Sequence, residues 1–329
     1  MQSRTSPRER FRSRSLGQYA GMVAEFPSDP FRAVFTDDVI ARLRSRQNPT
    51  DQLTHRLKVF ETSGQQSGPY AIRRRALKAA WDAYLYAGFA LGLFEGEHGK
   101  ELLSRLTGVD DDSFRSGMSE CLAAWYLAGP LGLSVEPRPE GRPGHPLEFV
   151  IRHPDGDINV EVKAPYRPML TEGFAWFDDS DMFIGGLKAA NKQLSQTTKN
   201  LLVVVPQMSV QITKEFRTPL EKAFIGETMI STPIDLRTGG PAGPTTYPFE
   251  ERGHLTRSGK ESPRFTRVSG VLYLGEMLSD DYRSIQHLAL LVYNPNAPLS
   301  LPRDIWKDTR FFARERGQWA WSDNGKRGL

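Results

Sequence analysis

Apolar residues recur at helical spacing over residues 112–129, a segment with helix signals at both ends. The apolar stripe consists of Phe114, Met118, Cys121, Leu122 and Trp125. Asp112 or Ser113 can cap the first turn, and the dipeptide Gly129-Pro130 ends the pattern. The pattern therefore predicts a helix over these residues, with one face packed against the core.

Helical periodicity also dominates the chain before this segment. It predicts helices over 37–47, 70–93 and 99–106, the first capped near Thr36, with the patch SGQQSGP at 63–69 as a linker. The long Ala-rich segment carries the aromatic residues Trp81, Tyr84, Tyr86 and Phe89. These rings favour a helix–helix interface over a platform on which bases stack.

After residue 130 the pattern becomes that of strands. LEFVIR at 147–152 and the run DINVEVKAP predict two strands joined by the turn-rich HPDGD. A helix-like segment at 185–194 and the β-branched run LLVVVP at 201–206 follow. Strand, helix and buried strand together predict a βαβ unit with a right-handed crossover.

Beyond residue 206 the expected elements are spaced further apart. The sequence predicts a short helix over 218–226 and a long Gly- and Pro-rich loop over 237–263. Two further strands are expected at 268–274 and 287–293, followed by an aromatic and basic tail that docks on the body.

The second strand of the predicted hairpin carries an acid and a lysine two residues apart. Because side chains alternate along a strand, Glu161 and Lys163 share one face, while Val162 points the other way, toward the core. Glu148 joins that face if the hairpin loop holds an even number of residues. Two carboxylates and an ammonium on one patch suit a divalent cation and a phosphodiester. The solvated face of an edge hairpin carries the same residue types.

A third acid, Glu120, lies off the apolar stripe of the helix predicted at 112–129. It shares a face with Ala123, Ala124 and Leu127. Burial of an unpaired carboxylate is costly, so Glu120 requires a partner there. It either belongs to one polar site with the hairpin or lies at the rim of a core helix and pairs with a nearby Arg.

In this order the segments resemble the PD-(D/E)xK superfamily, the restriction-endonuclease-like nucleases. The matching residues are Glu120 in the first helix, Pro146-Leu147-Glu148 in the second strand, Glu161-Val162-Lys163 in the third, and Gln193 on the following helix. The resemblance covers residues 112–206 and extends toward residue 296 through two apolar runs. The first acid of the hairpin is Glu where Asp is commoner, and one extra residue separates it from the Pro. Asp157 shares strand parity with Glu161 and is the alternative ligand.

The resemblance implies a fold and a metal centre. The fold is α/β, a restriction-endonuclease-like core with a mixed central sheet flanked by helices, plus a helical N-terminal region. Glu148, Glu161 and the backbone carbonyl of Val162 would hold Mg²⁺ or Mn²⁺, with water and phosphate oxygens completing the shell.

The resemblance also implies roles for the other residues. Lys163 would orient or help deprotonate the attacking water and stabilise charge on the phosphate. Glu120 would act on a second metal ion or on metal-bound waters. Gln193 would contact the phosphate or align Lys163. Lys188 and Lys192 are weaker candidates for this contact, since their spacing favours a solvated helix face.

Composition suits a soluble globular protein, with 329 residues of which 39% are hydrophobic and 25% charged. The single cysteine, Cys121, excludes a disulfide framework and a Cys-based zinc site, and it belongs to the core stripe. The longest apolar stretch, 83–94, is too short to span a bilayer, and we find no secretory signal. We therefore expect a cytoplasmic protein. The six histidines are scattered, and His145 is expected in a turn.

Charge is distributed unevenly along the chain. Residues 1–75 carry 14 Lys and Arg against seven Asp and Glu, whereas the whole chain has a net charge of +4. The opening SPRERFRSRS predicts a basic, polar arm that either contacts a phosphate backbone or only adds solubility. Within the long loop the candidate phosphate contacts are Arg252, His254, Arg257 and Lys260.

We predict four regions: a basic N-terminal region (1–66), a helical segment packing on the core (67–111), a nuclease-like domain (112–300) and the tail (301–329). The predicted function is metal-dependent hydrolysis of phosphodiester bonds in nucleic acid, DNA in preference to RNA, without a membrane partner. One alternative is a module on the same fold that binds nucleic acid or protein without catalysis. Another is an unrelated fold whose hairpin carries surface charge. The sequence leaves open whether the chain forms a homodimer.

Overall fold

A computed structural model describes residues 27–47, 49–62, 66–137, 147–165, 180–206, 227–228, 232–235, 237–246, 249–250, 265–306, 309–315 and 318–323. The predicted basic arm, the helix expected at 218–226 and the loop residues Arg252, His254, Arg257 and Lys260 lie outside these ranges. Within them the chain is a mixed α/β protein, as the sequence predicts.

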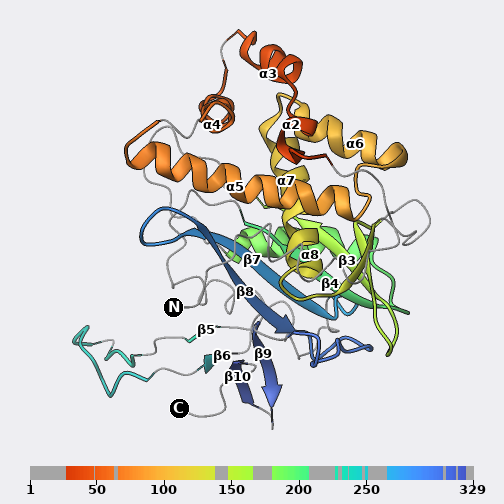
Figure 1. The fold of residues 1–329 in the computed structure, drawn as a ribbon. Helices are drawn as coiled ribbons and strands as arrows, with labels where there is room; N and C mark the ends of the chain where they lie inside the picture. Colours follow the sequence, from red (N-terminus) through yellow and green to blue (C-terminus); the bar gives the residue numbers. More distant parts are fainter. Residues whose placement is uncertain are drawn as a thin grey trace, which may run out of the picture.

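Helices cover both faces of a curled, mixed sheet (Figure 1). The layer on one face consists of α2 (Pro30–Val34), α3 (Asp37–Arg44), α4 (Asp51–Phe60), α5 (Pro69–Ala90), α6 (Gly96–Thr107) and α7 (Asp111–Ala128). On the other face lies α8 (Ser180–Gln193), whose Leu187 and Ala190 are buried against the sheet. The central strand Lys199–Val204 is thus buried on both sides.

The main sheet has the strand order β1-β2-β3-β4-β7-β8-β9-β10. Its strands are β1 (Ser134–Pro137), β2 (Phe149–Arg152), β3 (Ile158–Lys163), β4 (Lys199–Val204), β7 (Gly270–Leu278), β8 (Ile285–Tyr293), β9 (Arg310–Glu315) and β10 (Gln318–Asp323). The strands β5 (Glu227–Thr228) and β6 (Phe249–Glu250) form a separate pair.

Strand directions divide the main sheet into parts. The strands β1, β2 and β3 form an antiparallel meander, and β3, β4 and β7 are parallel. Helix α8 connects β3 to β4, so the predicted βαβ unit is present. Beyond β7 the pairing is antiparallel to β8, parallel from β8 to β9, and antiparallel to β10.

The helices predicted at 37–47, 70–93, 99–106, 112–129 and 185–194 are confirmed, with shifts of a few residues at their ends. The hydroxyl of Thr36 caps α3 as expected, since Oγ1 accepts from the N–H of Val39 at 3.3 Å. The cap of α7 is Asp110 instead of Asp112 or Ser113, and its Oδ2 accepts from the N–H of Ser113 at 2.8 Å. Three acids in a row allow the helix to begin one residue early, which places Asp111 and Asp112 in its first turn.

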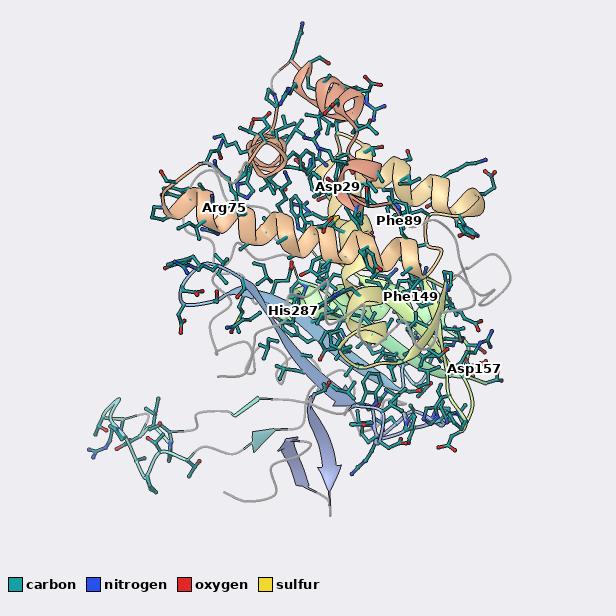
Figure 2. The ribbon with its side chains drawn as sticks, viewed as in Figure 1. Asp29, Arg75, Phe89, Phe149, Asp157 and His287 are labelled. Atoms are coloured by element: carbon teal, nitrogen blue, oxygen red, sulfur yellow. The ribbon has the colours of Figure 1, made fainter. Side chains whose placement is uncertain are left out.

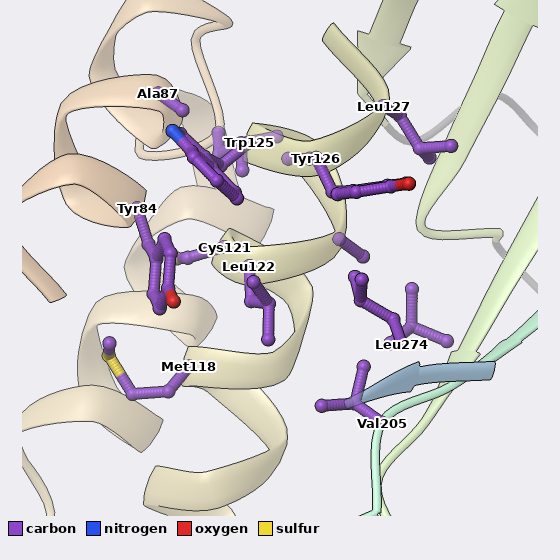
Figure 3. Close-up of a cluster of buried hydrophobic side chains, with 14 of the residues drawn as sticks. Tyr84, Ala87, Met118, Cys121, Leu122, Trp125, Tyr126, Leu127, Val205 and Leu274 are labelled. Atoms are coloured by element: carbon purple, nitrogen blue, oxygen red, sulfur yellow. The ribbon is translucent and has the colours of Figure 1, made fainter. Parts of the chain in front are cut away.

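Helix α7 lies between α5, α6 and the sheet (Figure 3). The predicted stripe is buried, but so is nearly the whole circumference of the helix from Phe114 to Ala128. Tyr84 of α5 lies on one side of the helix, and Leu274 of β7 on the other. Cys121 is fully buried in this contact, and burial raises the pKa of its thiol, which confirms core packing.

A polar cluster connects strands β7 and β8 to helix α5. The Tyr84 hydroxyl donates to Glu276 Oε1 at 2.5 Å and lies 2.6 Å from His287 Nε2 (His287 is labelled in Figure 2). The indole of Trp125 packs on the His287 ring, with 4.5 Å between centroids. Glu276 and His287 are cross-strand partners on β7 and β8. The cluster therefore fixes this strand pair against α5 and α7.

The C-terminal segment contributes two strands that the sequence did not predict. Its first strand, β9, adds to the edge of β8, where Leu291 pairs with Phe311. Trp306, just before it, is completely buried. None of the helices in the described ranges is long and apolar enough to cross a membrane.

Candidate functional site

The β2–β3 hairpin places Glu148 opposite Glu161. In its register Phe149 pairs with Val160, so Glu148, one residue before β2, continues the ladder toward Glu161. This register meets the condition of an even loop. The backbone N–H of Val162 donates to Glu148 Oε2 at 3.2 Å and holds the carboxyl against β3.

Glu161 and Lys163 point to the α8 side of the sheet. Their partners on β4 are Leu202 and Val204, whose side chains lie in the α8 core. The Glu161 side chain is fully buried, and its Oε1 contacts the Lys163 ammonium. Its Oε2 is also buried and, in the ionised pair, accepts no hydrogen bond from the residues that the structure describes. Glu161 Oε2 is thus a buried acceptor without a hydrogen bond, in a place where an unsatisfied charge is costly.

Burial raises the pKa of the Glu148 carboxyl well above its usual range, and the adjacent Glu161 carboxylate raises it further. Glu120 adds to this effect, whereas the Lys163 ammonium opposes it. A protonated Glu148 can donate a hydrogen bond to Glu161, but an ionised Glu148 repels it. The Lys163 ammonium balances one of the two negative charges, so the second requires either a proton or a further cation.

Replacing Glu148 by Gln is expected to stabilise the metal-free protein at about pH 8, by on the order of 1–3 kcal/mol. The pKa of Glu148 is higher in the folded chain than in the unfolded chain. Wild-type stability therefore falls as pH rises through the folded pKa, while the neutral amide avoids this loss. Urea unfolding with EDTA at about pH 4 and pH 8 measures the difference, which should vanish at the lower pH. A variant less stable than wild type at both values would contradict the argument.

Lys163 lies between the buried Glu161 carboxylate and solvent. Its side chain is 25% exposed, while that of Glu161 has no exposure. Helix α8 passes close to it at Gly186, where an added Cβ would lie 3.5 Å from the Lys163 Cβ. That distance is an ordinary van der Waals contact, so α8 packs directly beside the stem of the lysine. An external anion can therefore reach the Lys163 ammonium.

Glu120 approaches from the opposite layer and is held by a cation of its own. The guanidinium of Arg105, on α6, donates to both carboxylate oxygens, at 2.5 and 3.0 Å. Burial disfavours the Arg105 charge, but the hydrogen bonds and charge of Glu120 outweigh it and raise the pKa of Arg105. Arg105 and Glu120 both lie within electrostatic range of Glu148.

Of the two alternatives for Glu120, the structure shows pairing with an Arg, because the Arg105 guanidinium holds both of its carboxylate oxygens. Its oxygens are occupied, which argues against the predicted role as a metal ligand. Sequence analysis missed Arg105. The available signal was the need of a buried Glu120 for a cation, but nothing in the pattern selected one arginine among many.

Gln193 shares a face of α8 with Gly186, the helix residue beside Lys163. It is the last residue of α8, seven residues after Gly186, which is about 10 Å along the helix axis from the contact with Lys163. Lys188 and Lys192 carry exposed side chains on the same helix. The phosphate contacts expected of these three residues therefore stay predictions.

Asp157, the alternative ligand, lies at the other end of the hairpin. Figure 2 labels Phe149 at the start of β2 and Asp157 in the turn before β3. The exposed Asp157 carboxylate pairs with Arg152. It is therefore separated from Glu161 by most of the length of β3.

Glu148 and Glu161 could supply two carboxylate ligands of a divalent cation. Within the described ranges, no group of three or more His, Cys, Asp or Glu side chains is arranged to hold a metal ion. Mg²⁺, however, is commonly held by one or two carboxylates together with water and substrate phosphates. The Val162 carbonyl lies on the same edge of β3 as its N–H, which faces Glu148. These groups suit an ion shared with a phosphate ligand.

Comparisons of the chain with models of protein families, with curated proteins and with solved structures found no match. In class, the chain is a mixed α/β protein with a pair of carboxylates and a lysine at the strand ends of its sheet.

Proposed function

We propose that this chain is a metal-dependent nuclease with a restriction-endonuclease-like core, acting on DNA in preference to RNA. The observation that carries the proposal is the grouping of Glu148, Glu161 and Lys163 at the ends of β2 and β3. The element order α7-β1-β2-β3-α8-β4, with a meander followed by a helix and a parallel strand, supports the resemblance seen in the sequence.

In this proposal Glu148 and Glu161 hold Mg²⁺ or Mn²⁺ with the Val162 carbonyl. The bound ion would supply a Lewis acid that polarises a phosphate and lowers the pKa of water. The carboxylates remain fixed when ligand binds, because Glu161 is fully buried and a backbone N–H holds Glu148. A site that stabilises charge in the transition state requires groups that are preorganised in this way.

Lys163 acts at the solvent side of the acids. Its ammonium contacts a phosphate oxygen and stabilises the negative charge that grows during hydrolysis. It also orients the attacking water beside Glu161. The Arg105–Glu120 pair has a positioning role, since its charges lie beside Glu148 and contribute to the field at that carboxyl.

The second candidate function is a module that binds nucleic acid or protein without catalysis. The observation that favours it is the engagement of Glu120 by Arg105, which leaves two carboxylates for a cation. In that case we expect the site to bind its ligand equally well with and without a metal ion.

Incubation of the purified chain with plasmid, single-stranded DNA and RNA tests the proposed function. We expect cleavage with Mg²⁺ or Mn²⁺, faster on DNA, and its complete loss in EDTA because the carboxylate pair then lacks its cation. Gel analysis of the products over time measures it. Binding of these substrates without cleavage in either metal would reject the nuclease and favour the binding module.

A further inference from the structure

The helices α4 and α5 together present a surface with a strong positive charge. His55 and Lys58, one turn apart on α4, are exposed. Arg73 and Arg74, near the start of α5, lie within electrostatic range of His55. With Tyr70 these residues define the α4–α5 basic surface. Arg75, labelled in Figure 2, marks where this end of α5 lies.

Acidic residues do not balance this charge along the chain. Between Glu61 and Asp82 there is no Asp or Glu. Glu61 itself is engaged by Arg44, with 2.8 Å between Nε and Oε1. Partial burial lowers the pKa of His55, and the positive charges of Arg73, Arg74 and Lys58 lower it further. An anion at this surface would relieve that repulsion.

An exposed aromatic ring accompanies the cations. The side chain of Tyr70 is 74% exposed, the largest value for a big apolar residue in the described ranges. It precedes Arg73 and Arg74 by three and four residues, so the three side chains share one side of α5. Cations that track phosphates beside a ring that can stack on a base form the usual surface for unpaired nucleic acid.

We infer that the α4–α5 basic surface binds single-stranded nucleic acid, with Arg73, Arg74 and Lys58 on phosphates and Tyr70 on a base. The choice of nucleic acid as the ligand rests on the proposed function. The surface belongs to the helical layer, away from the β2–β3 hairpin in sequence. The α4–α5 basic surface is therefore a second place at which a nucleic-acid strand is bound, separate from the site of cleavage.

Binding is measured by the fluorescence anisotropy of a labelled oligothymidylate of about 20 nucleotides, in EDTA so that cleavage cannot occur. Arg73→Ala combined with Arg74→Ala should weaken binding about tenfold or more at low salt. It should also lower the slope of log affinity against log salt by about 0.7 for each lost phosphate contact. Tyr70→Ala should weaken binding about fivefold or more, whereas Tyr70→Phe should retain it.

The matched control removes two charges elsewhere, as Lys100→Ala combined with Arg152→Ala. Lys100 pairs with Glu97 on α6 and Arg152 with Glu136 on β1, so both charges lie outside α4 and α5. Circular dichroism melts show whether each variant is folded. Equal losses in the control and in the Arg73/Arg74 variant, or unchanged binding by the Tyr70→Ala variant, would overturn the inference. So would tighter binding of a duplex of the same length than of the single strand.

The outcome separates this inference from the proposed function. A chain that cleaves DNA with Mg²⁺ but whose affinity is unaffected by the Arg73/Arg74 variant refutes the surface and leaves the nuclease standing. A chain that binds single strands through this surface but cleaves no substrate refutes the nuclease alone.

Discussion

Glu161→Gln is expected to lower the rate of metal-dependent cleavage by at least about 10³-fold, and Lys163→Ala by about 10²–10⁴-fold. The amide retains the size of the carboxylate but loses the charge that a hard cation requires. The lysine variant loses the ammonium that contacts Glu161 and whose side chain is 25% exposed to solvent. Single-turnover cleavage of labelled DNA with saturating Mg²⁺ measures both rates.

Asp157→Asn provides the matched control for these variants. It removes a carboxylate from the same hairpin, but from an exposed position paired with Arg152 at the far end. Its cleavage rate should stay close to that of wild type. Cleavage that persists in Glu161→Gln would show that the activity belongs to another site or to a contaminant. Equal losses in Asp157→Asn and Glu161→Gln would point to a general effect on the hairpin.

Arg105→Met is expected to destabilise the chain by about 3–5 kcal/mol, because it leaves the buried Glu120 carboxylate without its cation. The side chain of Glu120 is only 6% exposed, so water cannot replace the guanidinium. Combining Arg105→Met with Glu120→Gln should recover most of the loss, since no unpaired charge remains. Urea unfolding with a common slope measures the three free energies of unfolding.

Arg152→Met is the control for this comparison. Arg152 also pairs with two acids, Glu136 and Asp157, but in solvent, where such pairs contribute about 0–1 kcal/mol. If Arg105→Met lowered the free energy of unfolding as little as Arg152→Met does, burial would not make the Arg105–Glu120 pair more important than an exposed one. The double variant also tests the site, because its cleavage rate reports on Glu120 apart from its effect on folding.

Much of the fold follows from local patterns. Periodicity alone located α3, α5, α6 and α7, and alternation along β3 placed Glu161 and Lys163 on one face with Val162 opposite. The two long strands β7 and β8 were expected as shorter runs. Strand β1 was missed, because its four residues include a Glu and a Pro and carry no apolar alternation. The β9–β10 hairpin was missed because an edge pairing depends on a distant strand.

The sequence by itself determined which residues alternate and which recur along a helix, because these relations depend only on backbone geometry over a few residues. Tertiary structure decided the hairpin register that sets Glu148 beside Glu161 and the pairing of Glu120 with Arg105 from another helix. It also decided that α8 packs beside Lys163 at Gly186. Such relations depend on how elements pack, and packing is selected by the burial of surfaces and charges across the whole core.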